Sequence, residues 1–307
     1  MNLIYHTQIP AKLILFGEWG VLKGYPALGV ALEKFFQCHL EESSQEGLQI
    51  ESPECTFHWI KEEEKAPEFL VNTQKALNYI FQKPLHKLNK KKLILKRNWQ
   101  LSEGLGSSSA LFLALLSLDQ KLFKNKNQFS KNDLCAFQKQ LIDFQKGGSG
   151  FDLLIQACGG FLKTTLNEID REKIELPEEL LLIHTGHKMK TNEALKNREP
   201  NERILSEIGK STENFIKYRN WEVCIHEHYE LLKMLGVVPD FVSSLKDEWI
   251  EKDWITCLKT TGAGGGDTLM LWTKLEYQEA LLKEIKQKGY WIESAKPTPQ
   301  SAFHLDF

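Results

Sequence analysis

Three glycine-rich segments, far apart in the chain, constrain its fold most strongly. They occupy residues 104–110 (GLGSSSA), 147–152 (GGSGFD) and 262–267 (GAGGGD). Glycine leaves backbone N–H groups uncovered and adopts positive φ, so consecutive amides can converge on an anion. A helix that begins directly after such a loop adds the positive end of its dipole. The three segments therefore predict one shared site for the phosphates of a nucleotide.

The composition of the chain limits the classes of function. Its 307 residues are enough for two domains, and 42% hydrophobic with 26% charged residues is typical of a globular protein. The net charge of −2 argues against a nucleic-acid partner, which would require a basic face. The basic runs 90–92 and 121–126 are therefore expected to be solvated surface.

Neither a disulfide framework nor a membrane anchor is predicted. The six cysteines have no paired short spacing, which disfavours a structural zinc site and fits reduced thiols. No run reaches the ~18 apolar residues of a membrane span, and residues 1–6 lack the pattern of a signal peptide. We expect a cytoplasmic protein without a membrane partner, and the sequence is compatible with a monomer or a homodimer.

Apolar spacing predicts an α+β protein in two domains. Strands are expected at 13–16, 27–32, 180–183, 268–272 and 290–293, and helices at 71–81, 110–116, 131–146, 202–218, 222–235 and 276–288. The polar, acidic stretch 168–177 separates the two halves of this pattern. We therefore predict an N-terminal domain at 1–170 and a C-terminal domain at 171–307, which carries the third glycine segment.

Several common catalytic motifs are absent. The chain has neither a G-x-x-x-x-G-K-[ST] loop nor a G-x-G-x-x-G that follows a strand and opens a helix. The serine at 149 lacks the G-x-S-x-G spacing of a hydrolase. The His226-Glu227-His228 run is not H-E-x-x-H, and alternate helix positions point away from one another, so a metal site there is disfavoured.

Three motifs together resemble those of the GHMP kinases, in the order and spacing of that superfamily. They are residues 10–18 (PAKLILFGE), 104–110 (GLGSSSA) and 261–267 (TGAGGGD). The resemblance implies a two-domain α+β fold, with an N-terminal ribosomal-protein-like βαβ domain that binds nucleotide and Mg²⁺ and a C-terminal ferredoxin-like domain. It implies an ATP-dependent small-molecule kinase whose active site lies between them.

Within the superfamily the chain resembles the mevalonate-pathway branch, where the features divide. Residues 17–28 and 235–239 are similar to mevalonate kinases, although those usually carry histidine where Trp19 stands. Residues 148–152, Asp267, and Thr185-Gly186 followed by Thr191 resemble phosphomevalonate kinases. Leu141 occupies the position of the magnesium-binding glutamate of mevalonate kinases, and Asp143 would lie on another helix face. The balance favours the phosphomevalonate type.

The resemblance implies transfer of the γ-phosphate to an alcohol, a reaction in which the protein mainly positions groups and neutralises charge. Asp152 is the predicted general base, because the acceptor hydroxyl must lose its proton. By the resemblance Lys12 lies near that base, where its charge would favour the ionised carboxylate and an incipient alkoxide. Asp152 and Lys12 are therefore the predicted catalytic residues, although an aspartate after a glycine turn could also serve as a helix cap.

The predicted cofactors are ATP and Mg²⁺. By the resemblance Ser108 would bind the metal, together with phosphate oxygens and water. The serines of the first segment could instead serve as helix caps. The predicted nucleotide-binding residues are Gly104, Leu105, Gly106, Ser107, Ser108, Ser109, Gly262, Ala263, Gly264 and Gly265.

The predicted partner is a small-molecule acceptor. A phosphorylated acceptor would need cations, and His187, Lys188 and Lys190 follow the 185–186 turn. These residues, like Arg198 and Arg203, could equally be surface charges. The predicted substrate-binding residues are Glu18, Ser149, Gly150, Lys188 and Thr191.

Three other functions remain open at the level of the sequence. A related diphosphomevalonate decarboxylase would also use ATP and an aspartate, but its expected arginine does not follow Gly150. A kinase for another small alcohol would share every motif. A non-catalytic nucleotide or metabolite sensor on the same scaffold is disfavoured, because Lys12, Ser108 and Asp152 are all present.

Overall fold

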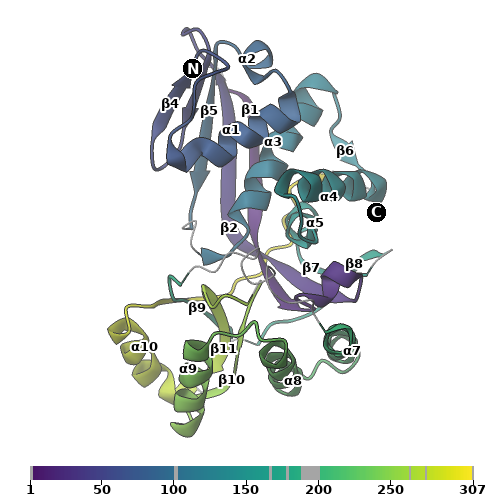
Figure 1. Ribbon diagram of the computed structural model, residues 1–307, viewed down its shortest axis with the longest axis vertical. Coiled ribbons are helices and arrows are strands. Elements are labelled where there is room, and N and C mark those ends of the chain that lie inside the picture. Colours follow the sequence, from purple (N-terminus) through teal and green to yellow (C-terminus); the bar gives the residue numbers. More distant parts are fainter. Residues whose placement is uncertain are drawn as a thin grey trace.

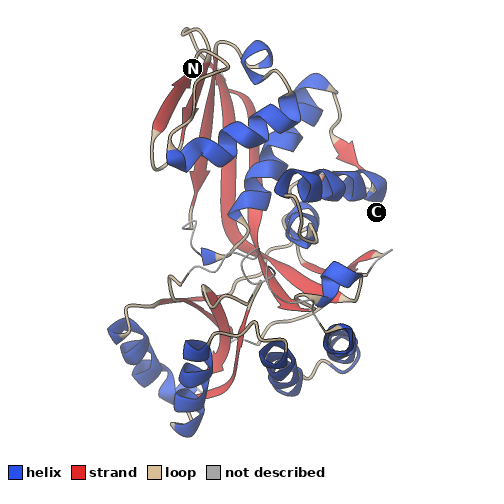
Figure 2. Ribbon diagram, in the orientation of Figure 1, coloured by secondary structure: helices blue, strands red, loops and turns tan. Residues whose placement is uncertain are grey.

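The computed structural model describes residues 3–99, 103–165, 168–177, 180–187, 201–262, 264–273 and 275–305. Two large β-sheets, each accompanied by helices, lie one above the other (Figures 1 and 2), and a third sheet has only two short strands. The long strands β1 (Leu3–Phe16) and β2 (Ala27–Glu42) run the height of the upper part and end near the lower sheet (Figure 1). The junction of the two parts is thus built by the ends of continuous strands.

The first sheet is mostly antiparallel and is centred on β2. Strand β1 pairs along one edge of β2, while β5 and β7 pair with different stretches of its other edge. Residues 27–32 of β2 are all buried, whereas Phe36, Cys38 and Leu40 alternate with more exposed residues, as in a strand with one solvated face. Its other strands are β3 (Leu48–Glu51), β4 (Thr56–Trp59), β5 (Lys91–Arg97), β7 (Phe161–Thr164) and β8 (Ile169–Glu172).

Helices pack on this sheet and bury its main core. Helices α3 and α5 contact β1 directly, and α1 and α4 contact α3. Most of α3 is buried, which agrees with its nearly uncharged sequence. The helices are α1 (Val71–Phe81), α2 (Pro84–Lys87), α3 (Ser107–Phe123), α4 (Lys131–Gln145) and α5 (Phe151–Cys158).

The second sheet has the strand order β10-β11-β9-β12, with every pair antiparallel. Along the chain its elements follow a β-α-β-β-α-β order, the ferredoxin-like arrangement. Trp249 and Tyr229 fill the core between this sheet and its helices. The elements are β9 (Leu180–His184), α7 (Glu202–Tyr218), α8 (Trp221–Met234), α9 (Asp240–Glu251), β10 (Ile255–Thr260), β11 (Thr268–Thr273), α10 (Gln278–Gln287) and β12 (Trp291–Ser294).

The predicted α+β fold with two sheets is confirmed, and the helix expected at 71–81 has those bounds. Strand β8 pairs with β7 and so carries the first sheet past residue 170, and the second sheet begins at Leu180. The basic run at 90–92 lies largely within β5, where Lys91 and Lys92 form ion pairs with carboxylates of neighbouring strands. Lys91 and Lys92 are thus partly buried, ion-paired residues of a strand that was not predicted, rather than solvated surface.

Near its C-terminus the chain returns to the first part of the molecule. Strand β13 (His304–Leu305) pairs in parallel with β6 (Gln128–Phe129), and Pro297 forms a bridge with Leu32. The six cysteines are free thiols. Among the described residues, no helix combines the length and the apolar character needed to cross a membrane.

Candidate active site

The first and third glycine segments converge on Lys12, near the middle of β1. The Lys12 backbone N–H donates to the Leu105 carbonyl at 3.1 Å. A Cβ placed on Gly106 would lie 2.9 Å from Lys12 Cγ, and one on Gly262 would lie 3.9 Å from Lys12 Nζ. The buried lysine stem therefore lies between two segments that are far apart in the sequence.

The second glycine segment brings Asp152 to the same lysine. Gly150 adopts φ 65° as the N-cap of α5, and Asp152 stands in the first turn of that helix. Its Oδ1 lies 3.2 Å from Lys12 Nζ, with 5% of the lysine side chain and 36% of the aspartate side chain exposed. The carboxylate is thus paired with a buried cation and still accessible to a ligand.

The start of α3 faces this junction. Its N-cap is Gly106 with φ 87°, and no side chain caps the helix, so the first amide groups remain available for an anion. The three serines differ in their contacts: Ser107 Oγ accepts from Trp99 Nε1 at 2.7 Å, and Ser109 Oγ donates to the Gly106 carbonyl at 3.0 Å. Ser108 is exposed, and its Oγ accepts from Gln145 Nε2 at 3.2 Å.

The third segment lies between the two sheets. Thr261 Oγ1 donates to the Ile14 carbonyl of β1 at 2.9 Å, and Gly264 and Gly266 adopt positive φ. Asp267 ends the segment, and its Oδ2 would lie 2.7 Å from a Cβ placed on Gly104. Burial raises the pKa of Asp267, against the Thr268 N–H and Lys12, which lower it. Ala263 lies outside the described residues.

Glu18, predicted to bind substrate, is instead held in a buried ionic cluster. Its carboxylate accepts from Lys259 of β10 and lies 2.8 Å from His228 Nε2 of α8. Burial alone would raise the pKa of Glu18, but Lys259 and His228 outweigh it and lower the pKa to about 2. Glu18, His228 and Lys259, here called the triad, have at most 1% of each side chain exposed.

Two groups compete for Nε2 of the triad's histidine. The Gly17 N–H points to Nε2 at 3.2 Å as a donor, whereas the ionised Glu18 carboxylate, 2.8 Å from the same nitrogen, can only accept a proton from it. The shorter, charge-assisted contact favours the proton on Nε2. The buried Nδ1 has no hydrogen-bond partner among the described residues. Burial lowers the pKa of His228, against the contribution of Glu18, so the ring is neutral. The sequence carried one signal for this cluster: a lysine within the apolar run of β10.

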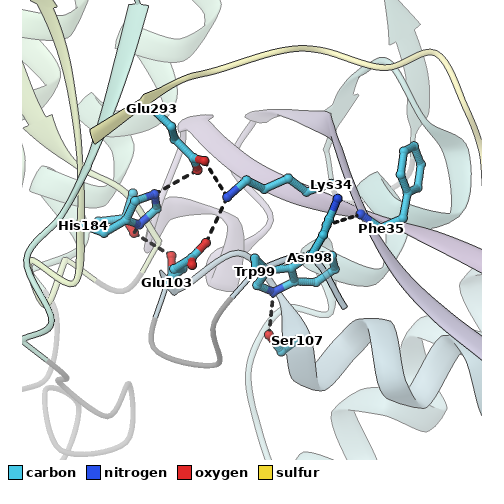
Figure 3. Close-up of polar contacts among 9 residues, drawn as sticks. Lys34, Phe35, Asn98, Trp99, Glu103, Ser107, His184 and Glu293 are labelled. Atoms are coloured by element: carbon cyan, nitrogen blue, oxygen red, sulfur yellow. Dashed lines mark hydrogen bonds and ion pairs between the residues drawn. The ribbon is translucent and has the colours of Figure 1, made fainter. Parts of the chain in front are cut away.

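A second cluster joins the two sheets beside the first glycine segment (Figure 3). Lys34 Nζ of β2 lies 3.1 Å from Glu103 Oε2 and 2.6 Å from Glu293 Oε2. His184 Nε2 lies 2.9 Å from Glu293 Oε1. Lys34, Glu103, His184 and Glu293 are here called the tetrad; the sequence analysis named none of them.

The carboxylate that binds magnesium in mevalonate kinases has no direct replacement. Leu141 is 1% exposed within the core, and Asp143 Oδ2 accepts from the Tyr79 hydroxyl at 2.7 Å. Oxygen donors suit Mg²⁺, and among the described residues Ser108 offers a hydroxyl at the start of α3. This donor set fits a metal held chiefly by nucleotide phosphates and water.

The other predicted acceptor contacts are only partly described. Ser149 Oγ accepts from the Phe151 N–H at 3.2 Å, one turn before Asp152. His187 stacks on Phe241 with ring centroids 4.5 Å apart. Lys188 and Thr191, like Lys190 and Arg198, lie outside the described residues.

Comparisons with known proteins point to one group of enzymes, although no family model matches the chain. A mevalonate kinase from Pyrococcus furiosus is 26% identical over 331 residues, covering 94% of this chain and 98% of that protein. One from Thermococcus sibiricus is 25% identical over 292 residues, covering 85% and 86%.

Solved structures share the fold. The Methanococcus jannaschii mevalonate kinase matches with a TM-score of 0.75 and 22% identity, covering 95% of this chain and 98% of that one. A Streptococcus pneumoniae phosphomevalonate kinase, in complex with phosphomevalonate and AMPPNP, matches with a TM-score of 0.70 and 15% identity, covering 94% and 99%.

Proposed function

Because the chain is a mevalonate-kinase-like member of the GHMP kinase superfamily, we propose that it transfers the γ-phosphate of ATP to the hydroxyl group of mevalonate. The observation that carries the proposal is the meeting of all three glycine segments at Lys12 and Asp152. Uncovered amides, a buried cation and an accessible carboxylate are the groups that phosphoryl transfer requires.

In the proposed mechanism, the amides at the start of α3 and in the third glycine segment hold the triphosphate. They neutralise charge that develops on the γ-phosphate oxygens in the loose transition state. Asp152 accepts the proton of the acceptor hydroxyl, which then attacks phosphorus. The Lys12 ammonium, 3.2 Å from Asp152, holds the carboxylate in place.

We further propose that Mg²⁺ accompanies the nucleotide. When bound, the ion would offset negative charge on the phosphates, and Ser108 would contribute its hydroxyl. Gln145, which donates to Ser108, orients that hydroxyl.

Phosphomevalonate is the second candidate acceptor. Leu141 and Asp267 favour it, since both match the phosphomevalonate type in the sequence. The curated relatives named above are mevalonate kinases, and mevalonate is therefore the acceptor proposed here. The distinction is best tested by measuring ADP release with mevalonate and with its 5-phosphate side by side.

The base is tested by Asp152→Asn, with Asp143→Asn as the matched control. We expect Asp152→Asn to lower kcat at least about a hundredfold, because general bases contribute effects of that size. The affinity for ATP should remain nearly unchanged, since in the proposed mechanism Asp152 acts on the acceptor hydroxyl. Asp143→Asn should retain activity. Turnover of Asp152→Asn within about tenfold of the original protein would contradict the assignment, and ATP binding without turnover of either acceptor would favour a sensor.

A further inference from the structure

The tetrad connects the first and third glycine segments through a chain of hydrogen bonds (Figure 3). Glu103 directly precedes Gly104, and Thr268 directly follows Asp267. The Thr268 hydroxyl donates to the Glu103 carbonyl and lies 2.9 Å from His184 Nδ1. His184 is therefore hydrogen-bonded to the residue that follows the third segment. Through Thr268 it is also linked to Glu103, the residue that precedes the first segment.

The directions of these bonds determine the protons on His184. The Thr268 hydroxyl has one hydrogen, which it gives to the Glu103 carbonyl, so it can only accept from Nδ1. Glu293 also bonds to Lys34, and a carboxylate in that setting can only accept from Nε2. Burial would raise the pKa of Glu293, but His184 and Lys34 outweigh it and lower that pKa. Both ring nitrogens of His184 thus carry protons.

Resting on the proposed phosphoryl transfer, we propose that His184 acts as an imidazolium that positions the first and third glycine segments for the triphosphate. It is a positioning residue, since it acts through Thr268 and Glu103. If Nε2 lost its proton, two acceptors would face each other at 2.9 Å and the bond to Glu293 would be lost. The His184 ring, which donates to Thr268, would then no longer be fixed by Glu293 of β12.

Charge balance supports the imidazolium. Among its own four side chains, the tetrad contains the carboxylates of Glu103 and Glu293 and the ammonium of Lys34, so a charged His184 supplies the second cation. Arg97 also interacts electrostatically with Glu103 from outside the tetrad. Only 2% of the His184 side chain is exposed, and a buried excess of negative charge would be costly. Asp267 on the third segment adds a further nearby acidic group.

The same geometry argues against a metal ion in this cluster. Glu103, His184 and Glu293 offer ligand atoms within 4.8 Å of one another. However, Lys34 already bonds to both carboxylates, and a cation would have to displace its ammonium. The proton on Nε2 would also have to leave.

The test measures binding of a non-hydrolysable ATP analogue, without acceptor, from about pH 5 to about pH 8, the range in which histidine charge changes. We expect the affinity of the original protein to fall as pH rises. His184→Gln should bind about tenfold more weakly at the acidic end, where a charge-assisted bond is lost, and should show a flatter pH profile. Glu33→Gln, an exposed neighbour on β2, is the matched control and should follow the original protein.

A spectroscopic measurement keeps the inference testable if His184→Gln does not fold. With labelled histidine, the nitrogen signals of His184 should be those of a doubly protonated ring near neutral pH. In Glu293→Gln, which removes the anion that holds the second proton, the nitrogen signals should be those of a singly protonated ring under the same conditions. A singly protonated ring in the original protein, or a doubly protonated ring in Glu293→Gln, would overturn the inference.

Failure of this inference is distinguishable from failure of the proposed function. A protein that binds the analogue with the expected pH profile but releases no ADP with either acceptor would support the role of His184 and contradict the kinase proposal. Full turnover combined with the same pH profile of analogue binding in His184→Gln and in the original protein would support the kinase proposal and contradict the role of His184.

Discussion

The triad and the tetrad both join the two sheets through a histidine beside a glutamate, yet they differ in charge and in exposure. The triad is buried from solvent, with at most 1% of any side chain exposed, and its histidine is neutral. In the tetrad the Lys34 and Glu293 side chains are 17% and 19% exposed, and its histidine is inferred to be charged. The two rings also differ at their second nitrogen: Nδ1 of His228 has no partner among the described residues, whereas Nδ1 of His184 donates to Thr268.

The contrast teaches that a buried cluster needs as many cations as carboxylates, whatever residues supply them. One glutamate in the triad is matched by Lys259, so His228 stays neutral. The two glutamates of the tetrad are matched by Lys34 and, in the proposed state, by a charged His184, while Arg97 also acts on Glu103. The variants below test this comparison, in order of expected effect.

The largest effect is expected from Lys259→Met in the triad. The substitution leaves the buried Glu18 carboxylate without its main counterion, and breaking a buried pair costs about 3–5 kcal/mol. Chemical denaturation would measure the loss of unfolding free energy. As a control, Lys210→Met removes an exposed ion pair with Glu207 and should change stability little. A loss no larger than that of the control would contradict the triad.

A double-mutant cycle should detect strong coupling within the triad. Glu18→Gln alone leaves Lys259 as an unpaired buried charge, but in Glu18→Gln/Lys259→Met no unpaired charge remains. The double variant should therefore be more stable than the sum of the single effects predicts, with a coupling energy of up to about 3 kcal/mol. Additive losses, measured by the same denaturation experiments, would rule out a direct interaction.

Lys34→Met in the tetrad should cost less than Lys259→Met. Lys34 is partly exposed, so water can approach the carboxylates that it leaves behind. We expect a loss of about 1–2 kcal/mol in unfolding free energy. If Lys34→Met proved as costly as Lys259→Met, exposure would not be what separates the two clusters.

The smallest effect concerns the pH dependence of stability. Because the folded-state pKa of His228 is lowered, its contribution is present above the ordinary histidine value of 6.5 and declines as pH falls below it, since the unfolded chain binds the proton more readily. His228→Gln keeps a donor for Glu18 but does not titrate. The free energy of unfolding should therefore decline less steeply with falling pH in the variant. Equal slopes would indicate that the folded protein accepts the proton.

The sequence by itself predicted the α+β fold, the glycine-rich segments that meet in the structure and the resemblance to the GHMP kinases. Glycine runs and the strand and helix periods are local properties, so they can be read without knowing which segments meet. The helix at 71–81 is an example. The helix expected at 110–116 is also present, although it begins earlier, at Ser107, and ends later, at Phe123.

Only the tertiary structure decided which charged residues face one another. Glu18 meets His228 and Lys259 more than 200 residues away, and Lys34 meets Glu103 and Glu293 across the junction of the sheets. Nothing in the spacing of these residues reveals such pairs, because a buried ion pair depends on two remote backbones meeting at hydrogen-bond distance. The protonation of both histidines follows from those meetings and is therefore a property of the fold.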